Sequence, residues 1–354
     1  MKKVLMIFTA LLFNVFVGGA IAVATGFNPV AVMGVGSVLS FALPNIPGAL
    51  PIALQKEIWM SAIVERLFAD DSFLSKAFNA DEFVKAGKTV HIPNAGSPSN
   101  VVKNRKNFPA MVKHRDDVDL TFDLDEFTTD PIRIPHADTI ELNYNKRESI
   151  LGGDRRKLAE EIANDIVYKW SPSSSYTKRT TGDSVEAHVS GSTGNRKAFV
   201  QDDILAAMNQ FNKQDIPQED RYMLVDAVMY GQLLDSLTDK ESHAFFASAN
   251  IAQGIVGKLW TFNIMMRSKS GRYNSNLAPK EWTAPGTTTD HGAVLAWHID
   301  SVCRALGEVN MFDNISDPTY YGDIYSFLVR AGGRPMRKGG EGLLAIVQDT
   351  VAQT

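Results

Sequence analysis

Histidine, cysteine and carboxylate side chains carry much of enzyme chemistry, and here they show no catalytic or metal-binding spacing. Two of the seven histidines, His291 and His298, together with Asp300 come closest to a cluster of metal ligands, but their spacing fits no standard metal site. The sequence contains no GxSxG nucleophile motif, and Cys303 has no cysteine-nucleophile signature around it. We therefore expect no catalytic residue and no bound metal.

Glycine-rich loops for phosphates and acidic loops for calcium do not match the sequence either. Gly34 and Gly36 are not followed by the third glycine of a dinucleotide-binding fingerprint. Residues 254–259, GIVGKL, have too few residues between their glycines for a phosphate-binding loop. Residues 123–126, DLDE, lack the glycine that a calcium-binding loop requires. We expect no cofactor, and we expect the chain not to be an enzyme.

Charged residues are separated by sign between residues 102 and 130. Five basic and no acidic residues occupy 102–115, and seven acidic and no basic residues occupy 116–130. One interpretation is that both blocks are solvated strand faces. The other is a hairpin with opposite charges, through which copies of the chain bind one another's complementary patches around a ring. The candidate assembly contacts are Lys103, Arg105, Lys106, Lys113, Arg115, Asp116, Asp117, Asp119, Asp123 and Asp125.

A strand and a long helix would position these residues. Apolar and polar residues alternate over 118–124, which predicts a strand with one solvated face. In the helix that follows, Asp154 is the expected N-cap and Pro172 ends the pattern. Its apolar stripe, at steps of four, consists of Leu158, Ile162, Ile166 and Trp170.

The rest of the chain mixes helical and extended patterns. A short amphipathic helix is expected over 56–79, and the Ser-, Thr- and Gly-rich residues 171–197 predict a long surface loop. Further on, the patterns predict helices at 200–212 and 229–237, strands at 221–226 and 259–267, and two final strands joined by a glycine-rich turn within 320–349. The fold class is therefore α+β.

The first residues of the chain resemble a signal peptide or a membrane anchor. Lys2 and Lys3 precede an apolar run, and Ala20 and Ala22 stand where a signal peptidase accepts small residues. However, no charged residue occurs between Lys3 and Lys56, and this uncharged stretch is too long for a signal peptide. Four prolines, at 29, 44, 47 and 51, also interrupt it as a membrane helix. Three alternatives stand for residues 1–55: removal, burial against other subunits, and association with a membrane.

Composition limits the classes of function. With 354 residues, 44% of them hydrophobic and 21% charged, the chain is long enough for about two globular domains. The net charge of −4 argues against sequence-specific binding to nucleic acid. The single cysteine excludes a framework of intrachain disulfides.

From about residue 56 to its end, the sequence resembles major capsid proteins of tailed phages and prophages with the Hong Kong ninety-seven type fold. Four sequence segments carry this resemblance, and they are specific as a set although each is weak alone. The segments are NADEFVKAGKTVHIPNAGSPSNVVKNRKNFPA, DEFTTDPIRIPHADTIELNYNKRESILGGDRRKLAEEIANDIVYKW, IPQEDRYMLVDAVMYGQLL and YYGDIYSFLVRAGGRPMRKGGEGLLAIVQD.

The resemblance implies a division of the chain into structural parts. The long helix would be the spine of a peripheral domain. The implied parts are a hydrophobic N-terminal arm at 1–55, a helix leading into the shell domain at 56–79, an extended loop hairpin at 80–130, the peripheral domain with its spine helix at 131–198, an axial domain at 199–310, and C-terminal strands at 311–354 that return to the peripheral domain.

The resemblance also implies a function. It implies a structural protein that self-assembles, as hexamers and pentamers, into the icosahedral shell around phage double-stranded DNA. The implied partners are a portal, a scaffold or maturation protease, and packaged DNA contacted at most non-specifically. We expect the protein in the virion capsid, and in the host cytoplasm during assembly rather than exported. The alternatives are an encapsulin-like nanocompartment shell and, from the first 22 residues, a secreted or membrane-anchored binding protein.

Overall fold

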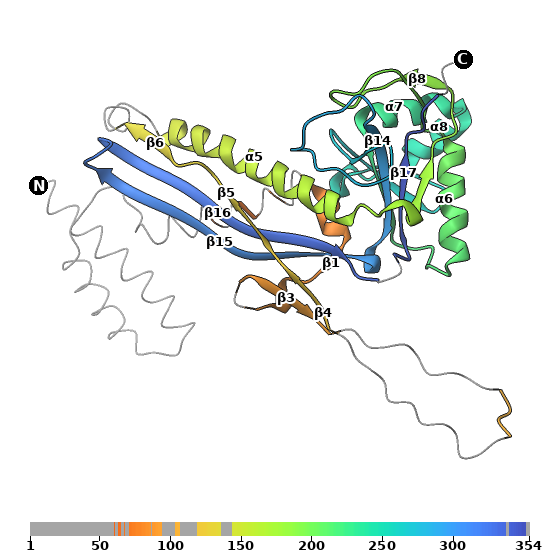
Figure 1. The fold of residues 1–354 in the computed structure, drawn as a ribbon, viewed down its shortest axis with the longest axis horizontal. Helices are drawn as coiled ribbons and strands as arrows, with labels where there is room; N and C mark the ends of the chain where they lie inside the picture. The colour runs from red at the N-terminus through yellow and green to blue at the C-terminus, as the bar shows by residue number, and fades with distance from the viewer. Residues whose placement is uncertain are drawn as a thin grey trace, which may run out of the picture. The chain divides into compact units, whose positions relative to one another are not determined.

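The computed structural model describes most of the chain beyond its first sixty residues. It covers Met60, Ile63, Val64 and Leu67, and then residues 71–85, 87–93, 103–106, 119–135, 144–337 and 340–351. All of these belong to one compact unit, Glu57–Thr354 (Figure 1). The predicted hydrophobic arm at 1–55 lies outside the described residues.

A seven-stranded mixed sheet forms the centre of the C-terminal half. Its strand order is β11-β12-β10-β14-β17-β7, and β13 pairs with β14 beside this path. The parallel neighbours are β10 with β12 and β17 with β7, whereas β14 runs antiparallel to β10, β13 and β17. The strands are β7 (Thr177–Arg179), β10 (Arg221–Asp226), β11 (Ile255–Leu259), β12 (Phe262–Arg267), β13 (Gly271–Tyr273), β14 (His291–His298) and β17 (Leu343–Val347).

Both faces of this sheet are covered, which explains why its central strands are apolar without alternation. Tyr222 and Leu224 of β10 belong to one core cluster, and Met223 and Val225 belong to another on the opposite face. The second face is covered by helices, which Figure 1 shows beside β14 and β17. They are α6 (Gln201–Lys213), α7 (Ala227–Ser236) and α8 (Asp239–Ala247).

A long antiparallel hairpin carries the second large sheet. Its strands β15 (Val302–Asp317) and β16 (Gly322–Pro335) pair along nearly their whole length. β1 (Phe78–Asn79) adds to β15 in parallel. Both β5 (Asp125–Thr128) and β6 (Ile132–Pro135) pair antiparallel with β16.

The spine helix α5 (Tyr144–Trp170) packs along this hairpin, as Figure 1 shows. Its predicted apolar stripe is buried: Leu158, Ile162, Ile166 and Trp170 are 5, 1, 2 and 0% exposed. The helix ends at Trp170, just before the Ser171-Pro172 pair, because the residue before a proline avoids helical geometry.

The predicted helix start at Asp154 is wrong. The helix begins ten residues earlier, at Tyr144, so Asp154 lies inside it and cannot act as its N-cap. The reason is that Gly152 and Gly153 weaken a helix without ending it, and no proline lies between Tyr144 and Trp170.

An aromatic cluster joins the spine helix to both sheets. Trp170 packs edge-on against Phe73 and tilted against Trp297 of β14, with ring centroids 5.9 and 5.6 Å apart. Its Nε1 donates to the carbonyl of Cys303 in β15 (3.0 Å), and Nε1 of Trp297 donates to the carbonyl of Lys76 (2.8 Å). Phe73 and Lys76 belong to the short helix η1 (Ser72–Lys76). This contact fixes how α5, β14 and β15 meet.

Two small sheets and four short helices complete the described elements. A three-stranded sheet has the order β2-β3-β4, and β8 pairs with β9. These strands are β2 (Val84–Lys85), β3 (Thr89–Ile92), β4 (Leu120–Asp123), β8 (Ser184–Glu186) and β9 (Asn195–Lys197). The short helices are η2 (Asp81–Phe83), η3 (Ser174–Tyr176), η4 (Ile251–Gln253) and η5 (Ile299–Ser301). No helix in the described part of the chain is both long and apolar enough to cross a lipid bilayer.

Two other expectations about local structure were too simple. The region 171–197 is not a plain loop, because β7, β8 and β9 lie within it. The single strand expected over 118–124 ends at Asp123, and the chain continues after Leu124 as β5, in a different sheet. Leu124 is only 4% exposed and its amide donates to the carbonyl of Lys88 (2.8 Å), so it serves as the corner between the two sheets.

The C-terminal strands divide between the two large sheets. β15 starts at Val302 and crosses residue 310, where the axial domain was expected to end. After β16 the chain turns back, and β17 enters the seven-stranded sheet between β14 and β7. The chain therefore passes between the two large sheets twice, from β14 to β15 and from β16 to β17. The two connections lie side by side, because the amide of Met336 donates to the carbonyl of Ser301 (2.9 Å).

Candidate assembly surface

The basic candidates that the structure describes lie in the segment 103–106. Lys103 and Lys106 are exposed and Arg105 is half-buried. Four other candidates, Lys113, Arg115, Asp116 and Asp117, lie outside the described residues. The described basic side chains thus present positive charge to solvent, as a contact with an acidic partner would require.

The acidic candidates lie on two strands that belong to different sheets. Asp119 precedes β4 and is exposed, and Asp123, at the end of β4, accepts a hydrogen bond from the hydroxyl of Thr89 (2.8 Å). β4 pairs with β3, so the described neighbour of the acidic strand is 89–92. Asp125 is the first residue of β5. The acidic block therefore follows the chain from one sheet into the next.

Asp125 is engaged within its own chain. Its carboxylate forms an ion pair with Lys169 of α5, and Lys169 also pairs with Asp165 at 3.0 Å. Burial alone would lower the pKa of Lys169, but the contacts with Asp125 and Asp165 outweigh it and raise the pKa above the ordinary lysine value. This pair fastens β5 to the end of the spine helix, and the Asp125 side chain remains 57% exposed.

Arg330 of β16 holds two carboxylates on the two strands that flank β16. It pairs with Glu126 of β5 (2.9 Å) and Glu308 of β15 (3.4 Å). A similar contact joins Arg304 of β15 to Asp81 (3.1 Å). Two of these pairs, Arg330–Glu126 and Arg304–Asp81, join residues 204 and 223 positions apart. Sequence reasoning missed all three because charge alone does not say which acid meets which base.

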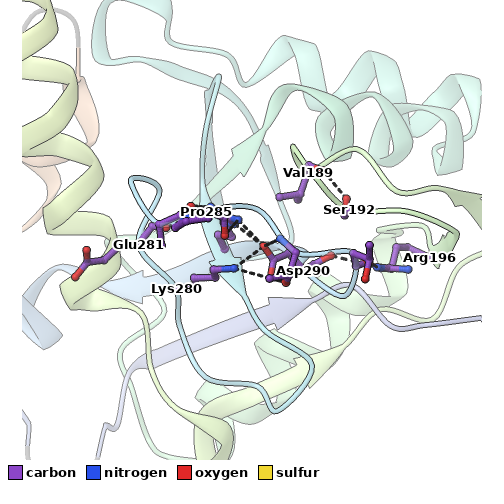
Figure 2. A network of polar contacts seen from close by, with 11 residues as sticks. Val189, Ser192, Arg196, Lys280, Glu281, Pro285 and Asp290 are labelled. Atoms are coloured by element: carbon purple, nitrogen blue, oxygen red, sulfur yellow. Dashed lines mark hydrogen bonds and ion pairs between the residues drawn. The ribbon is translucent and has the colours of Figure 1, made fainter.

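A polar network that sequence reasoning missed surrounds Asp290, directly before β14 (Figure 2). Asp290 is fully buried, and its carboxylate contacts Arg272 and Lys280 and accepts hydrogen bonds from the amide and hydroxyl of Thr287. Arg272 in turn donates to the carbonyls of Ala284 (2.9 Å) and Pro285 (3.2 Å). The network therefore holds the loop between β13 and β14 in one conformation.

Arg196 of β9 extends this network to a second loop. Its guanidinium donates to the carbonyls of Thr288 (3.1 Å) and Asp290 (3.2 Å), as Figure 2 shows. The two loops also touch where Gly191, at φ +83°, meets Gly286, because a Cβ on Gly191 would lie 2.9 Å from the Gly286 Cα. Neither glycine can carry a side chain without moving the other loop.

The candidate metal ligands His291, His298 and Asp300 do not form a metal site in the described part of the chain. His291 and His298 stand at opposite ends of the eight-residue strand β14. Nδ1 of His298 accepts from the amide of Asp300 (3.2 Å). Burial raises the pKa of the Cys303 thiol to about 11, which leaves it protonated at neutral pH. Within the described ranges, no cluster of three or more His, Cys, Asp or Glu could hold a metal ion.

The structure is similar to solved structures of phage capsids and heads. The capsid of cyanophage Pam1 has a TM-score of 0.53 and 10% identity, over 78% of this chain and 89% of that one. The capsid of Ralstonia phage GP4 has a TM-score of 0.52 and 11% identity, over 79% and 88%. The head of Helicobacter pylori bacteriophage KHP40 has a TM-score of 0.50 and 12% identity, over 80% and 91%.

The likeness lies in structure and not in sequence. No protein-family model matches the chain, and neither does any curated protein. The three capsid structures nevertheless share the arrangement over most of their own lengths. The chain therefore has the Hong Kong ninety-seven type fold of phage capsid proteins.

Proposed function

We propose that this chain is a non-enzymatic shell subunit that assembles with copies of itself, as pentamers and hexamers, into the icosahedral capsid around phage double-stranded DNA. The observation that carries the proposal is the fold, which matches phage capsid and head structures over about four-fifths of the chain. The first partner is thus a second copy of the chain, and its place is the virion.

The physical basis of the shell is the repetition of many modest contacts. In a closed lattice each subunit is held by several neighbours at once, so individually weak interfaces add up to a stable particle. The net charge of −4 suits this role, because packaged DNA carries its own counterions and the wall has no need to bind it tightly. DNA contact is then non-specific.

The domain assignment follows the same proposal. The spine helix and the β15–β16 hairpin are the core of the peripheral domain, and the seven-stranded sheet with α6, α7 and α8 is the axial domain. β17 returns to the axial sheet, so residues 311–354 contribute to both domains. In this proposal the segment 80–130, whose described strands β3 and β4 pair antiparallel, is the part that reaches a neighbouring subunit.

Within this proposal, the separated charges are the contact between copies. The exposed basic residues of 103–106 meet the acidic face around Asp119 and Asp123 of a neighbour, which are exposed in the single chain. Such contacts give register and partner choice more than raw affinity. The portal and a scaffold or maturation protease are further partners of the same proposal, and assembly takes place in the host cytoplasm.

Charge reversal tests this contact. A chain with Lys103→Glu, Arg105→Glu and Lys106→Glu should give at least about tenfold fewer particles, because each new like-charge pair opposes docking and a tenfold loss needs only about 1.4 kcal/mol. Particle yield is measured by sedimentation and electron microscopy, and circular dichroism checks that the subunit remains folded.

A matched control reverses three exposed lysines elsewhere, with Lys213→Glu, Lys240→Glu and Lys258→Glu. This variant has the same change in net charge and should assemble better than the loop variant. A normal particle yield from the loop variant would refute the charge contact while leaving the shell function itself untouched.

A further inference from the structure

The β15–β16 hairpin contains a β-bulge where the small sheet of β2, β3 and β4 packs against it. The pairing register of the two hairpin strands shifts between Leu306 and Val309. Within this shift, Gly307 and Glu308 of β15 stand opposite one residue of β16, Arg330, which also pairs with Glu308 (3.4 Å). Bulges bend a strand and change the direction of its side chains. This bulge is therefore a local feature that positions what packs on it.

The absence of a side chain at Gly307 makes room for the small sheet. A Cβ at this position would lie 2.7 Å from both the carbonyl oxygen of Gly87 and Cδ1 of Leu124, which is too close for a carbon atom. Gly87 lies between β2 and β3, and Leu124 directly follows β4. The φ angle of Gly307 is not positive, so this close approach, and not the backbone conformation, requires glycine here.

Polar contacts hold the chain to the hairpin on both sides of the small sheet. Before β2, the carboxylate of Asp81 pairs with Arg304 (3.1 Å) and accepts from the amide of Leu306 (2.7 Å), directly beside the bulge. After β4, Glu126 pairs with Arg330 (2.9 Å), which stands opposite the bulge. The chain is thus attached at or next to the bulge both where it enters the small sheet and where it leaves it.

We propose that Gly307, Glu308 and Arg330 form a seat that fixes the direction in which the segment between β3 and β4 leaves the subunit. The buried apolar cluster that joins the small sheet to β15 supplies attraction, but apolar contacts are not directional. The close contact at Gly307 and the polar contacts on either side of it act at separate points, and together they set an orientation.

The seat has a consequence for assembly, and this consequence rests on the proposed function. A segment that is already held in one direction loses less conformational freedom when it docks on a neighbouring subunit. The seat therefore favours assembly without touching the neighbour itself. Its presence is tested within one subunit, independently of the shell.

Hydrogen exchange in the unassembled full-length chain tests the seat. Gly307→Ala adds a methyl group that must displace Gly87 or Leu124, so the amides of β3 and β4 should exchange at least about tenfold faster than in the wild type, through local opening. The amides of β14, in the seven-stranded sheet, should be unchanged. Gly231→Ala is the matched control, because nothing lies within 4 Å of its added Cβ, and it should alter neither set of amides.

Unchanged exchange in β3 and β4 of the folded Gly307→Ala chain would overturn the proposal. Equally faster exchange in β14 would also overturn it, because the change would then be a general loss of stability. If Gly307→Ala does not fold, Arg330→Gln decides by the same two criteria, since it removes the charge that holds Glu126 and Glu308. Its control is Arg156→Gln, at an exposed position of α5, which should have no effect.

Particle yield is a separate readout. Gly307→Ala should give fewer particles than Gly231→Ala, because its segment is no longer held for docking. A wild-type chain that formed no particles would contradict the shell function and leave the exchange result valid.

Discussion

Replacing Trp170 with alanine should lower the free energy of unfolding by about 3–5 kcal/mol, as found for fully buried tryptophans. Trp170 is 0% exposed and sits where the spine helix meets both large sheets. The substitution removes its ring contacts with Phe73 and Trp297 and leaves the buried carbonyl of Cys303 without its indole donor. Denaturant unfolding of the full-length chain measures the loss.

The control for this prediction lies on the same helix. Lys157→Ala changes an exposed side chain and should alter the free energy of unfolding by no more than about 0.5 kcal/mol. If Trp170→Ala were as mild as Lys157→Ala, the aromatic cluster would not be the contact that joins α5 to β14 and β15.

Replacing Asp290 with asparagine should lower the free energy of unfolding by a comparable amount, about 3–5 kcal/mol, because it leaves the buried Arg272 and the partly buried Lys280 without their counterion. Arg272 and Lys280 pair with this single carboxylate, and their side chains are 3 and 18% exposed. Asparagine nearly matches the shape of aspartate, so the loss reports charge and hydrogen bonding rather than a cavity. Asp235→Asn, on the exposed side of α7, is the matched control and should be nearly neutral.

The same substitution predicts a pH dependence. Burial alone would raise the pKa of Asp290, but hydrogen bonds from Thr287, Lys280 and Arg272 outweigh it and hold the pKa well below its ordinary value. A carboxyl whose pKa is lowered by folding stabilises the folded state above its unfolded pKa, about 4, and loses this contribution as the pH falls below that value. The difference in the free energy of unfolding between the wild-type and Asp290→Asn proteins should therefore become smaller as the pH falls below about 4. A gap that stayed constant from pH 7 down to pH 2 would contradict the lowered pKa.

Local patterns were enough to predict the most regular elements. The apolar run of 221–226 is the buried strand β10, and the period of four along 158–170 matches the buried face of α5. In both cases the whole signal lies within a few neighbouring residues, which share one environment. Strand pairing was not predictable, because β10 pairs with β12 and β14, and β17 with β7, over separations that no local pattern encodes.

The errors also have a physical cause. Asp154 has the residue type of an N-cap, but tertiary packing extends the helix to Tyr144. The alternation over 118–124 suited a single strand, yet the buried Leu124 turns the chain into another sheet. The Asp290 network had one signal, an acidic residue near two basic ones in a polar stretch, but nothing in the sequence showed that its carboxylate would be fully buried.

Electron microscopy of the purified full-length chain tests the central claim most directly. The shell function predicts closed particles of uniform size, built from pentamers and hexamers, with the spine helix and the β15–β16 hairpin visible in each subunit of a reconstruction. A chain that remained monomeric and folded at every concentration, with no closed particles, would contradict it.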